Sequence, residues 1–178
     1  LVILSAKVAA GHKPRAMNNR IVKIASAIEL IHMASLIHDD VIDHCPIRHH
    51  RPTINSKWGQ DVSIVLGDYL YSLAFKLIAV CDNLDILDCI SSATESLCEG
   101  ELTQVAERGN LSLSRQRYIV IVKKKTASLF AASCEVGAIA FDCPRVLRHA
   151  LKRYGLNFGI GFQMIDDYLD IMSTQRQL

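Results

Sequence analysis

The chain has 178 residues, of which 50% are hydrophobic and 21% are charged. This composition excludes a disordered or collagen-like chain and provides enough apolar side chain for one buried core, so we expect a single domain over residues 1–178. With 20 basic and 18 acidic residues, the net charge of +2 gives no basic surface for nucleic acid, and no nucleic-acid partner is expected.

The cysteines and the uncharged runs exclude two further classes of protein. The six cysteines are scattered and form no C-x-x-C pair. This spacing is typical of reduced thiols, so we expect a cytoplasmic protein without a disulfide framework. The longest uncharged runs are shorter than the roughly 18 apolar residues that a membrane span needs, so no transmembrane segment is expected.

Apolar residues recur at spacings of three and four along most of the chain, and no stretch alternates long enough to predict a sheet. Breaks rich in Gly, Pro, Asn and Asp, the first at Gly11–Pro14, separate the periodic segments. We therefore predict an all-α fold, a bundle of long helices around a central cavity. In chain order the helices are expected at Leu1–Ala9, Arg20–Asp43, Asp61–Val80, Ile86–Glu107, Gln116–Ala140 and Pro144 to about Met172.

Two of these helices carry the same acidic pattern, since Asp39-Asp40-Val41-Ile42-Asp43 recurs in form as Asp166-Asp167-Tyr168-Leu169-Asp170. On a helix, positions i, i+1 and i+4 place three carboxylates within one turn on one side. Such carboxylates repel one another unless a cation lies between them, and hard oxygen ligands without nearby thiolates favour Mg²⁺. The predicted metal ligands are Asp39, Asp40, Asp43, Asp166, Asp167 and Asp170.

The second cluster lies in a longer motif. Gly159 to Asp170 reads G-I-G-F-Q-M-I-D-D-Y-L-D and is a complete match to GxxFQxxDDxxD. The chain thereby resembles the trans-isoprenyl diphosphate synthases (polyprenyl synthetases), whose two aspartate-rich motifs are DDxxD, and the resemblance runs along almost its whole length. It implies an isoprenoid synthase-like fold and a Mg²⁺-dependent prenyltransferase. Such an enzyme condenses isopentenyl diphosphate head-to-tail with an allylic diphosphate.

The resemblance also implies roles for residues outside the clusters. Arg48 matches the arginine that holds the allylic diphosphate. His49 stands where the family has a second arginine, a ligand for isopentenyl diphosphate, and Arg51 is close enough to substitute for it. His32, seven positions before Asp39, matches a histidine that helps bind isopentenyl diphosphate. Catalytic and substrate-binding roles are also implied for Lys125, Thr126 and Gln163.

Product length is expected to depend on the residues before Asp39. The side chains four and five positions earlier, Ser35 and Ala34, point toward the cavity floor. Where the family has bulky aromatic side chains there, they resemble stoppers for short products, whereas small residues leave a channel. Ile31 and Ile28 continue the stripe over about 16 Å of helix. We therefore expect a long-chain all-trans polyprenyl diphosphate as the product.

Three other interpretations stay open. A class I terpene cyclase also ionises diphosphates, although its second motif usually contains Asn, Ser or Thr and Glu. A regulatory or inactive subunit of a heteromeric prenyl synthase is the non-enzymatic alternative, because the arginine pair is altered at His49. Glu29-Leu30-Ile31-His32 is the E-x-x-H of di-iron bundles, but a second E-x-x-H is missing from the sequence.

The ends of the chain and its partners are further expectations from the resemblance. The chain begins at Leu1 and stops at Leu178, inside the family's pattern at both ends. The family segment expected before Leu1 carries a lysine and an arginine that bind isopentenyl diphosphate. These 178 residues are therefore expected to bind metal and diphosphate better than they catalyse. The family also implies a homodimer, and a peripheral membrane contact for product release is possible.

Overall fold

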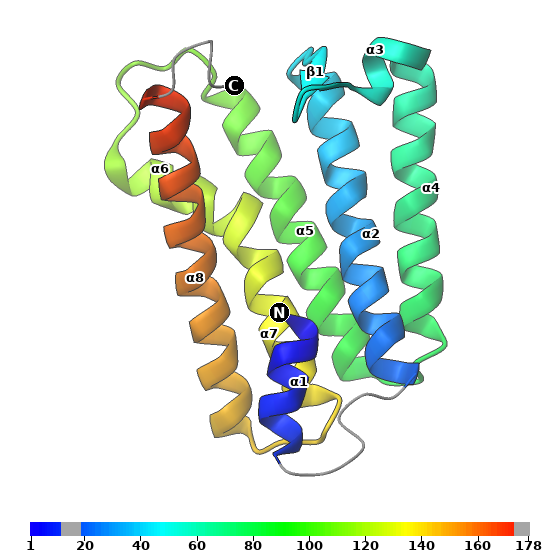
Figure 1. The fold of residues 1–178 in the computed structure, drawn as a ribbon. Coiled ribbons are helices and arrows are strands. Elements are labelled where there is room, and N and C mark those ends of the chain that lie inside the picture. The colour runs from blue at the N-terminus through cyan, green and yellow to red at the C-terminus, as the bar shows by residue number, and fades with distance from the viewer. Residues whose placement is uncertain (12–18, 173–178) are drawn as a thin grey trace.

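The computed structural model describes residues 1–11 and 19–172, and nearly all of them lie in helices that form a bundle (Figure 1). The predicted break at Gly11–Pro14 falls mostly outside these residues, as does the segment after Met172. In chain order the elements are α1 (Val2–Ala10), α2 (Asn19–Ile42), β1 (Ile47–Arg48), β2 (Arg51–Pro52), α3 (Ile54–Trp58), α4 (Gln60–Ala79), α5 (Leu84–Ala106), α6 (Arg115–Val122), the π turn η1 (Lys123–Ala127), α7 (Ser128–Ile139) and α8 (Arg145–Met172).

The all-α fold is confirmed, and the predicted helices agree with the observed ones to within two residues at each end. One expectation needs correction: the helix predicted over Gln116–Ala140 is interrupted by the π turn, so it consists of α6, η1 and α7. The interruption was not predicted because one extra residue in a turn shifts the apolar period too little to show in a single sequence.

Polar side chains at the predicted breaks fix where several helices begin. The Asn83 side chain accepts a hydrogen bond from the Ile86 amide at 2.9 Å, and the Ser114 hydroxyl accepts one from the Arg117 amide at 3.2 Å. These caps satisfy backbone donors that have no partner within the first turn. The caps fix the first residues of α5 and α6, which the apolar periodicity alone predicts only to within two residues.

A short hairpin follows α2 and was not expected from the sequence. Arg48 pairs with Arg51 across the two strands, and the turn between them, His49 and His50, has φ values of 48° and 61°. Positive φ at both central residues is the two-residue turn whose twist suits a hairpin. Strands of two residues are too short to show alternation, which is why this segment was predicted as a loop.

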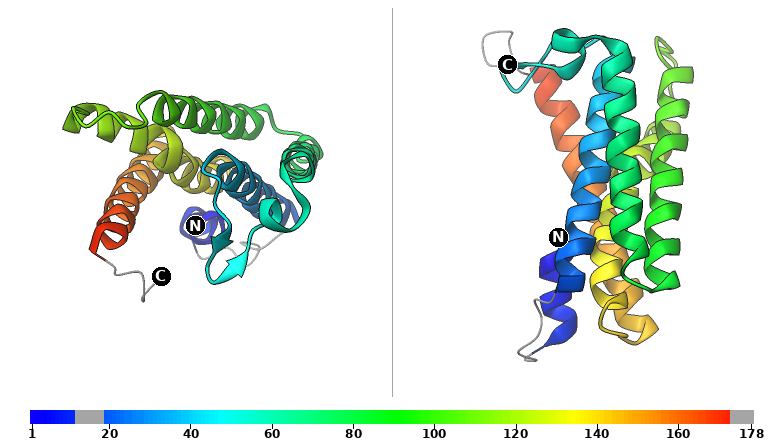
Figure 2. Two further views of the ribbon diagram at one scale, coloured as in Figure 1. Left: turned by 90° about the horizontal axis from the view of Figure 1, so that it is seen from above. Right: turned by 90° about the vertical axis from the view of Figure 1, so that its right-hand side faces the viewer.

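The core lies between α1, α2, α4, α5 and α7. Isoleucines dominate it, and those of α2 and α5 follow the predicted spacing of three and four. The fully buried ones are Ile21, Ile24, Ile31, Ile86 and Ile90. α7 lies between α2 and α8, and the C-terminal ends of α2 and α8 are both at the upper end of the bundle (Figures 1 and 2). The two aspartate clusters therefore occupy the same end.

Two helices, α2 and α4, are long and apolar enough to cross a membrane if judged by length and composition alone. This differs from the sequence estimate, which counted only uncharged runs. Core helices of soluble proteins also meet this criterion, so it is weak evidence for a span. In α2 the residues of the apolar stripe pack in the core described above.

Candidate functional site

The π turn contacts the first aspartate cluster directly and is linked to the second through Gln163. Lys125 Nζ is 3.4 Å from Asp39 Oδ2 in the first cluster. The next residue, Thr126, donates a hydrogen bond to Gln163 Oε1 at 2.8 Å. Gln163 in turn donates to Asp167 Oδ1 at 2.8 Å and to Asp166 Oδ2 at 3.3 Å. Two adjacent residues of η1 thus connect the clusters, although α2 and α8 are far apart in the sequence.

In the first cluster each aspartate is bound to a different cation. Arg48 Nε donates to Asp40 Oδ1 at 2.8 Å, and Arg108 Nη2 donates to Asp43 Oδ1 at 2.5 Å. The side chain of Asp40 is 8% exposed, whereas those of Asp39 and Asp43 are 15% and 41% exposed. Asp39 and Asp43, four residues apart, are therefore the pair that is open to a ligand.

The charges around the first cluster shift two pKa values. Burial raises the pKa of Asp39 to about 6, with Lys125 opposing the shift and the carboxylates of Glu101 and Asp43 adding to it. Partial burial lowers the pKa of Arg48, but its hydrogen bond and charge interaction with Asp40 raise it overall. Burial is thus the main reason that the protonated form of Asp39 is favoured, and Lys125 only partly offsets it.

In the second cluster both oxygens of Asp167 accept hydrogen bonds. Tyr118 of α6 donates to Oδ2 at 2.5 Å, while Gln163 donates to Oδ1. Burial, followed by the hydrogen bond to Asp167, raises the pKa of Tyr118 to about 12. Asp166 and Asp170 are exposed on the same helix. The cluster is therefore fixed at Asp167 and open at its other two carboxylates.

The remaining predicted residues lie near the clusters without binding to them. His32 is exposed on α2, and His49 and Arg51 are exposed on the hairpin. In the described part of the chain none of the three forms an ion pair or hydrogen bond with a cluster. Their proposed contacts with a substrate remain predictions.

The four residues expected to set product length lie inside the bundle. Ile31 and Ala34 are fully buried, and Ile28 and Ser35 are each 8% exposed. Ser35 donates a hydrogen bond to the carbonyl of His32 at 2.8 Å. Spacings of seven and four residues put Ile28, Ser35 and Asp39 on one stripe of α2, whereas Ala34 is turned about 100° away. Ser35 is thus better placed beneath Asp39 than Ala34.

The structure adds site residues that sequence reasoning missed. Glu101 and Arg108, seven residues apart along α5 and its C-terminal extension, bind Lys125 and Asp43. Tyr118 binds Asp167. A signal for Glu101 was present, because it continues the buried stripe of α5, where an unpaired carboxylate would be costly. Tyr118 had no such signal, since its position depends on the π turn.

The donor atoms of the clusters fit a hard divalent cation. All are carboxylate oxygens, and a bound cation would offset the loss of solvation that raises the pKa of Asp39. Among the described residues, no three acidic, histidine or cysteine side chains converge on one point, and the cations Lys125, Arg48 and Arg108 occupy the first cluster instead. Binding of a metal therefore requires Asp39 and Asp43 to exchange their cations for it.

A cavity of about 310 Å³ borders the candidate residues. Its lining includes Lys125, Thr126, Gln163 and Asp167 together with Tyr118. It is formed where η1, α6 and α8 meet. Lys125, which contacts the first cluster, therefore lines the same cavity as Asp167 of the second cluster.

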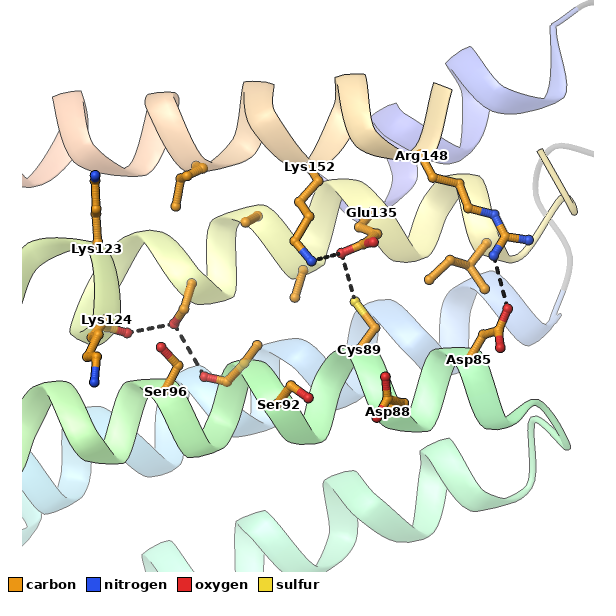
Figure 3. A pocket seen from close by; sticks show the side chains of 16 residues that line it. Asp85, Asp88, Cys89, Ser92, Ser96, Lys123, Lys124, Glu135, Arg148 and Lys152 are labelled. Atoms are coloured by element: carbon orange, nitrogen blue, oxygen red, sulfur yellow. Dashed lines mark hydrogen bonds and ion pairs between the residues drawn. The ribbon is translucent and has the colours of Figure 1, made fainter. Parts of the chain in front are cut away.

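A larger cavity of about 490 Å³ lies between α5, α7 and α8 and contains none of the candidate residues (Figure 3). Glu135 accepts a hydrogen bond from the Cys89 thiol at 3.4 Å and ion-pairs with Lys152 at 2.9 Å. Burial, followed by the charge of Glu135, raises the pKa of Cys89 to about 12, so this thiol is not a nucleophile at neutral pH. These polar contacts connect three helices rather than assemble a reactive group.

Comparison with known proteins gives consistent matches over nearly the whole chain. The family model described as Polyprenyl synthetase matches residues 1–178. Heptaprenyl diphosphate synthase component 2 of Geobacillus stearothermophilus is 37% identical over 159 residues, which cover 89% of this chain and 50% of that protein. Geranylgeranyl diphosphate synthase of Methanosarcina mazei is 36% identical over 159 residues, with coverages of 86% and 49%.

Among solved structures, the chain is similar to a polyprenyl synthase from Caulobacter crescentus CB15 complexed with calcium and isoprenyl diphosphate. The TM-score is 0.91 at 35% sequence identity, over 98% of this chain and 52% of that one. The chain thus spans about half the length of the curated relatives that it matches.

Proposed function

Because the chain belongs to the polyprenyl synthetase family, we propose that it condenses isopentenyl diphosphate with an allylic diphosphate to extend an all-trans polyprenyl chain. The observation that carries this proposal is the placement of Lys125, which contacts the first aspartate cluster, and of Thr126, which is linked to the second through Gln163. A diphosphate bound at η1 would meet carboxylates from both sides. The calcium and isoprenyl diphosphate in the Caulobacter crescentus structure support this ligand class.

Each residue has a definable task in this reaction. Asp39 and Asp43 at the C-terminal end of α2, with Asp166, Asp167 and Asp170 of α8, would hold Mg²⁺, while Asp40 fixes Arg48. When bound, Mg²⁺ supplies Lewis-acid stabilisation of the departing diphosphate. Lys125 and Arg48 add fixed positive charge to that leaving group.

The other side chains orient the substrate and keep water away. Thr126 and Gln163 fix the position of the second cluster and offer a hydroxyl and an amide to the diphosphate. The allylic cation left by ionisation is destroyed by water, so the surrounding wall must be apolar. Phe130 packs against Phe162 with ring centroids 5.4 Å apart and against Phe158 at 5.5 Å. Because Phe162 directly precedes Gln163 in the chain, we propose these rings as one part of that wall.

Incubation with Mg²⁺, isopentenyl diphosphate and a radiolabelled allylic starter tests the proposal. We expect extended all-trans polyprenyl diphosphates, identified by chromatography after removal of the phosphates. Cyclised hydrocarbons formed from the starter alone would instead indicate a terpene cyclase. The assay should also be run on a longer polypeptide that matches the full length of the relatives. If that polypeptide leaves the starter unreacted, the protein is a regulatory subunit.

Product length provides a second test, since we propose a long-chain product. Ser35 lies on the stripe beneath Asp39, so Ser35→Tyr is expected to place a ring in the path of the growing chain and shorten the product by several isoprene units. Met33→Tyr is the matched control, because Met33 is 46% exposed on another side of α2. Chromatography of the products measures both. An unchanged distribution from a Ser35→Tyr protein that melts like the parent would contradict the channel.

We also propose a homodimer that forms through α4. Val62, Val65 and Tyr69 are 48%, 67% and 58% exposed on one side of this helix and, with Leu66, form an apolar groove. Because one relative is named component 2 of its synthase, a different partner chain is the alternative. Sedimentation equilibrium of the purified protein distinguishes a dimer from a monomer that needs another component.

A cytoplasmic location with a peripheral membrane contact for product release remains a proposal. It is supported by the free state of all six cysteines. Cell fractionation with and without a high-salt wash tests it, since recovery only in a detergent extract would contradict a peripheral contact.

A further inference from the structure

Glu101 of α5 forms an ion pair with the Lys125 ammonium, which also pairs with Asp39 of the first cluster. Glu101 is 8% exposed and forms a close ion pair with Lys125, whose Nζ is also 3.4 Å from Asp39. The side chains of the lysine and of both carboxylates are no more than 19% exposed. One ammonium thus lies between two carboxylates in a setting where water screens them weakly.

The residue before Glu101 explains how the π turn comes so close to α5. A Cβ atom on Gly100 would lie 2.3 Å from the Lys125 amide nitrogen and 2.7 Å from its Cα. Both are backbone atoms that cannot move without moving η1. Glycine at position 100 therefore allows η1 to pack closely against α5. This packing brings Lys125 into contact with Glu101.

We propose that Gly100 and Glu101 are positioning residues that set how tightly Lys125 pairs with Asp39 and thereby how readily the first cluster takes up a divalent cation. The inference rests on the proposed function in one respect, the role of Asp39 as a cation ligand. When a cation binds Asp39, Lys125 must give up that carboxylate. Glu101 keeps the ammonium paired during this exchange, so the exchange costs little.

Without the negative charge of Glu101, release of Asp39 by Lys125 becomes costly. In Glu101→Gln the ammonium has only Asp39 as an anionic partner and competes with the incoming cation. We expect the affinity for Mn²⁺, a hard-cation probe whose free form is measured by electron paramagnetic resonance, to fall about tenfold. Glu99→Gln is the matched control on the same helix, because Glu99 ion-pairs with the neighbouring Lys124 and is half-exposed. Its effect is expected to stay below about twofold.

A double variant tests whether Glu101 acts through Lys125. In a Lys125→Gln background, Glu101→Gln is expected to change the Mn²⁺ affinity by less than about twofold. An equal loss in both backgrounds would mean that Glu101 binds the cation itself, and an unchanged affinity in the single variant would overturn the proposal. Thermal unfolding of each variant monitors the fold. The readout is cation binding and not product formation. If the protein makes no polyprenyl product but the variants still change the Mn²⁺ affinity as expected, the proposed function is refuted and this inference stands.

Discussion

Asp39→Asn is expected to lower the rate of product formation by about 100- to 1000-fold, the usual loss when one group that stabilises developing charge is removed. The amide keeps the size of the carboxylate but cannot balance a divalent cation or pair with Lys125. Asp39 is the aspartate of the first cluster that η1 contacts directly. Steady-state assays at saturating Mg²⁺ measure the loss, and a rate within about threefold of the parent protein would contradict the assigned role.

Two comparisons make the result specific. Asp88→Asn, on the exposed side of α5, removes the same charge away from both clusters and is expected to leave the rate unchanged. The pH dependence gives a second readout, since the pKa of Asp39 is raised to about 6. A carboxyl group must lose its proton to bind a cation, so the Mn²⁺ affinity of the parent protein should fall as the pH is lowered through about 6. In the Asp39→Asn protein, the contribution of Asp39 to this pH dependence of the Mn²⁺ affinity should be absent.

Gly155→Ala is expected to reduce the free energy of unfolding by about 1–3 kcal/mol and to displace the second cluster. A Cβ at position 155 would lie 2.4 Å from the carbonyl oxygen of Phe130 and 2.9 Å from the Cα of Ala131, both in the backbone of α7. Only Gly155 and Gly159 of α8 are buried, so this contact holds the helix in place. A shift of α8 would move Gln163 away from Thr126 and displace Asp166 and Asp167, so activity should fall as well.

Gly161→Ala is the matched control on the same helix. Nothing lies within 4 Å of a Cβ added at position 161. The substitution should therefore stabilise the protein by about 0.5–1 kcal/mol, because alanine loses less backbone freedom than glycine on forming a helix. Urea denaturation of the two variants measures both effects. If both substitutions change the free energy of unfolding in the same direction, the close contact between α7 and α8 does not exclude a side chain at position 155.

The sequence predicted the helices well because their apolar stripes are long. The isoleucines of α2 recur over six turns, and caps such as Asn83 lie where the stripes begin. The hairpin after α2 was beyond reach, since its two-residue strands carry no period. The π turn was also beyond reach, because three consecutive lysines give no apolar pattern from which to detect an extra residue.

The candidate site was predictable only in part. Spacing on one helix is a local property, so the carboxylates of Asp39 and Asp43 could be placed together before any fold was known. Pairing across helices is not local: the contacts of Arg108 with Asp43 and of Tyr118 with Asp167 depend on loop paths and on the π turn. Asp40 shows the limit within one cluster, because it was expected to face the other two and is instead buried against Arg48.

The π turn behaves as a one-residue insertion in an otherwise regular helix. Deleting one lysine from Lys123–Lys125 would allow a continuous α-helix with α6 and α7 close to their present relative orientation, because five residues of a π turn and four residues of an α-helix each complete slightly more than one turn. Because the three residues are identical, a lysine would still precede Thr126 after the deletion. The deletion would therefore keep the Lys-Thr pair and the orientation of α6, and it would remove only the π turn. For an engineer, the triplet offers a way to remove the π turn without altering the identity of the residues that face the diphosphate.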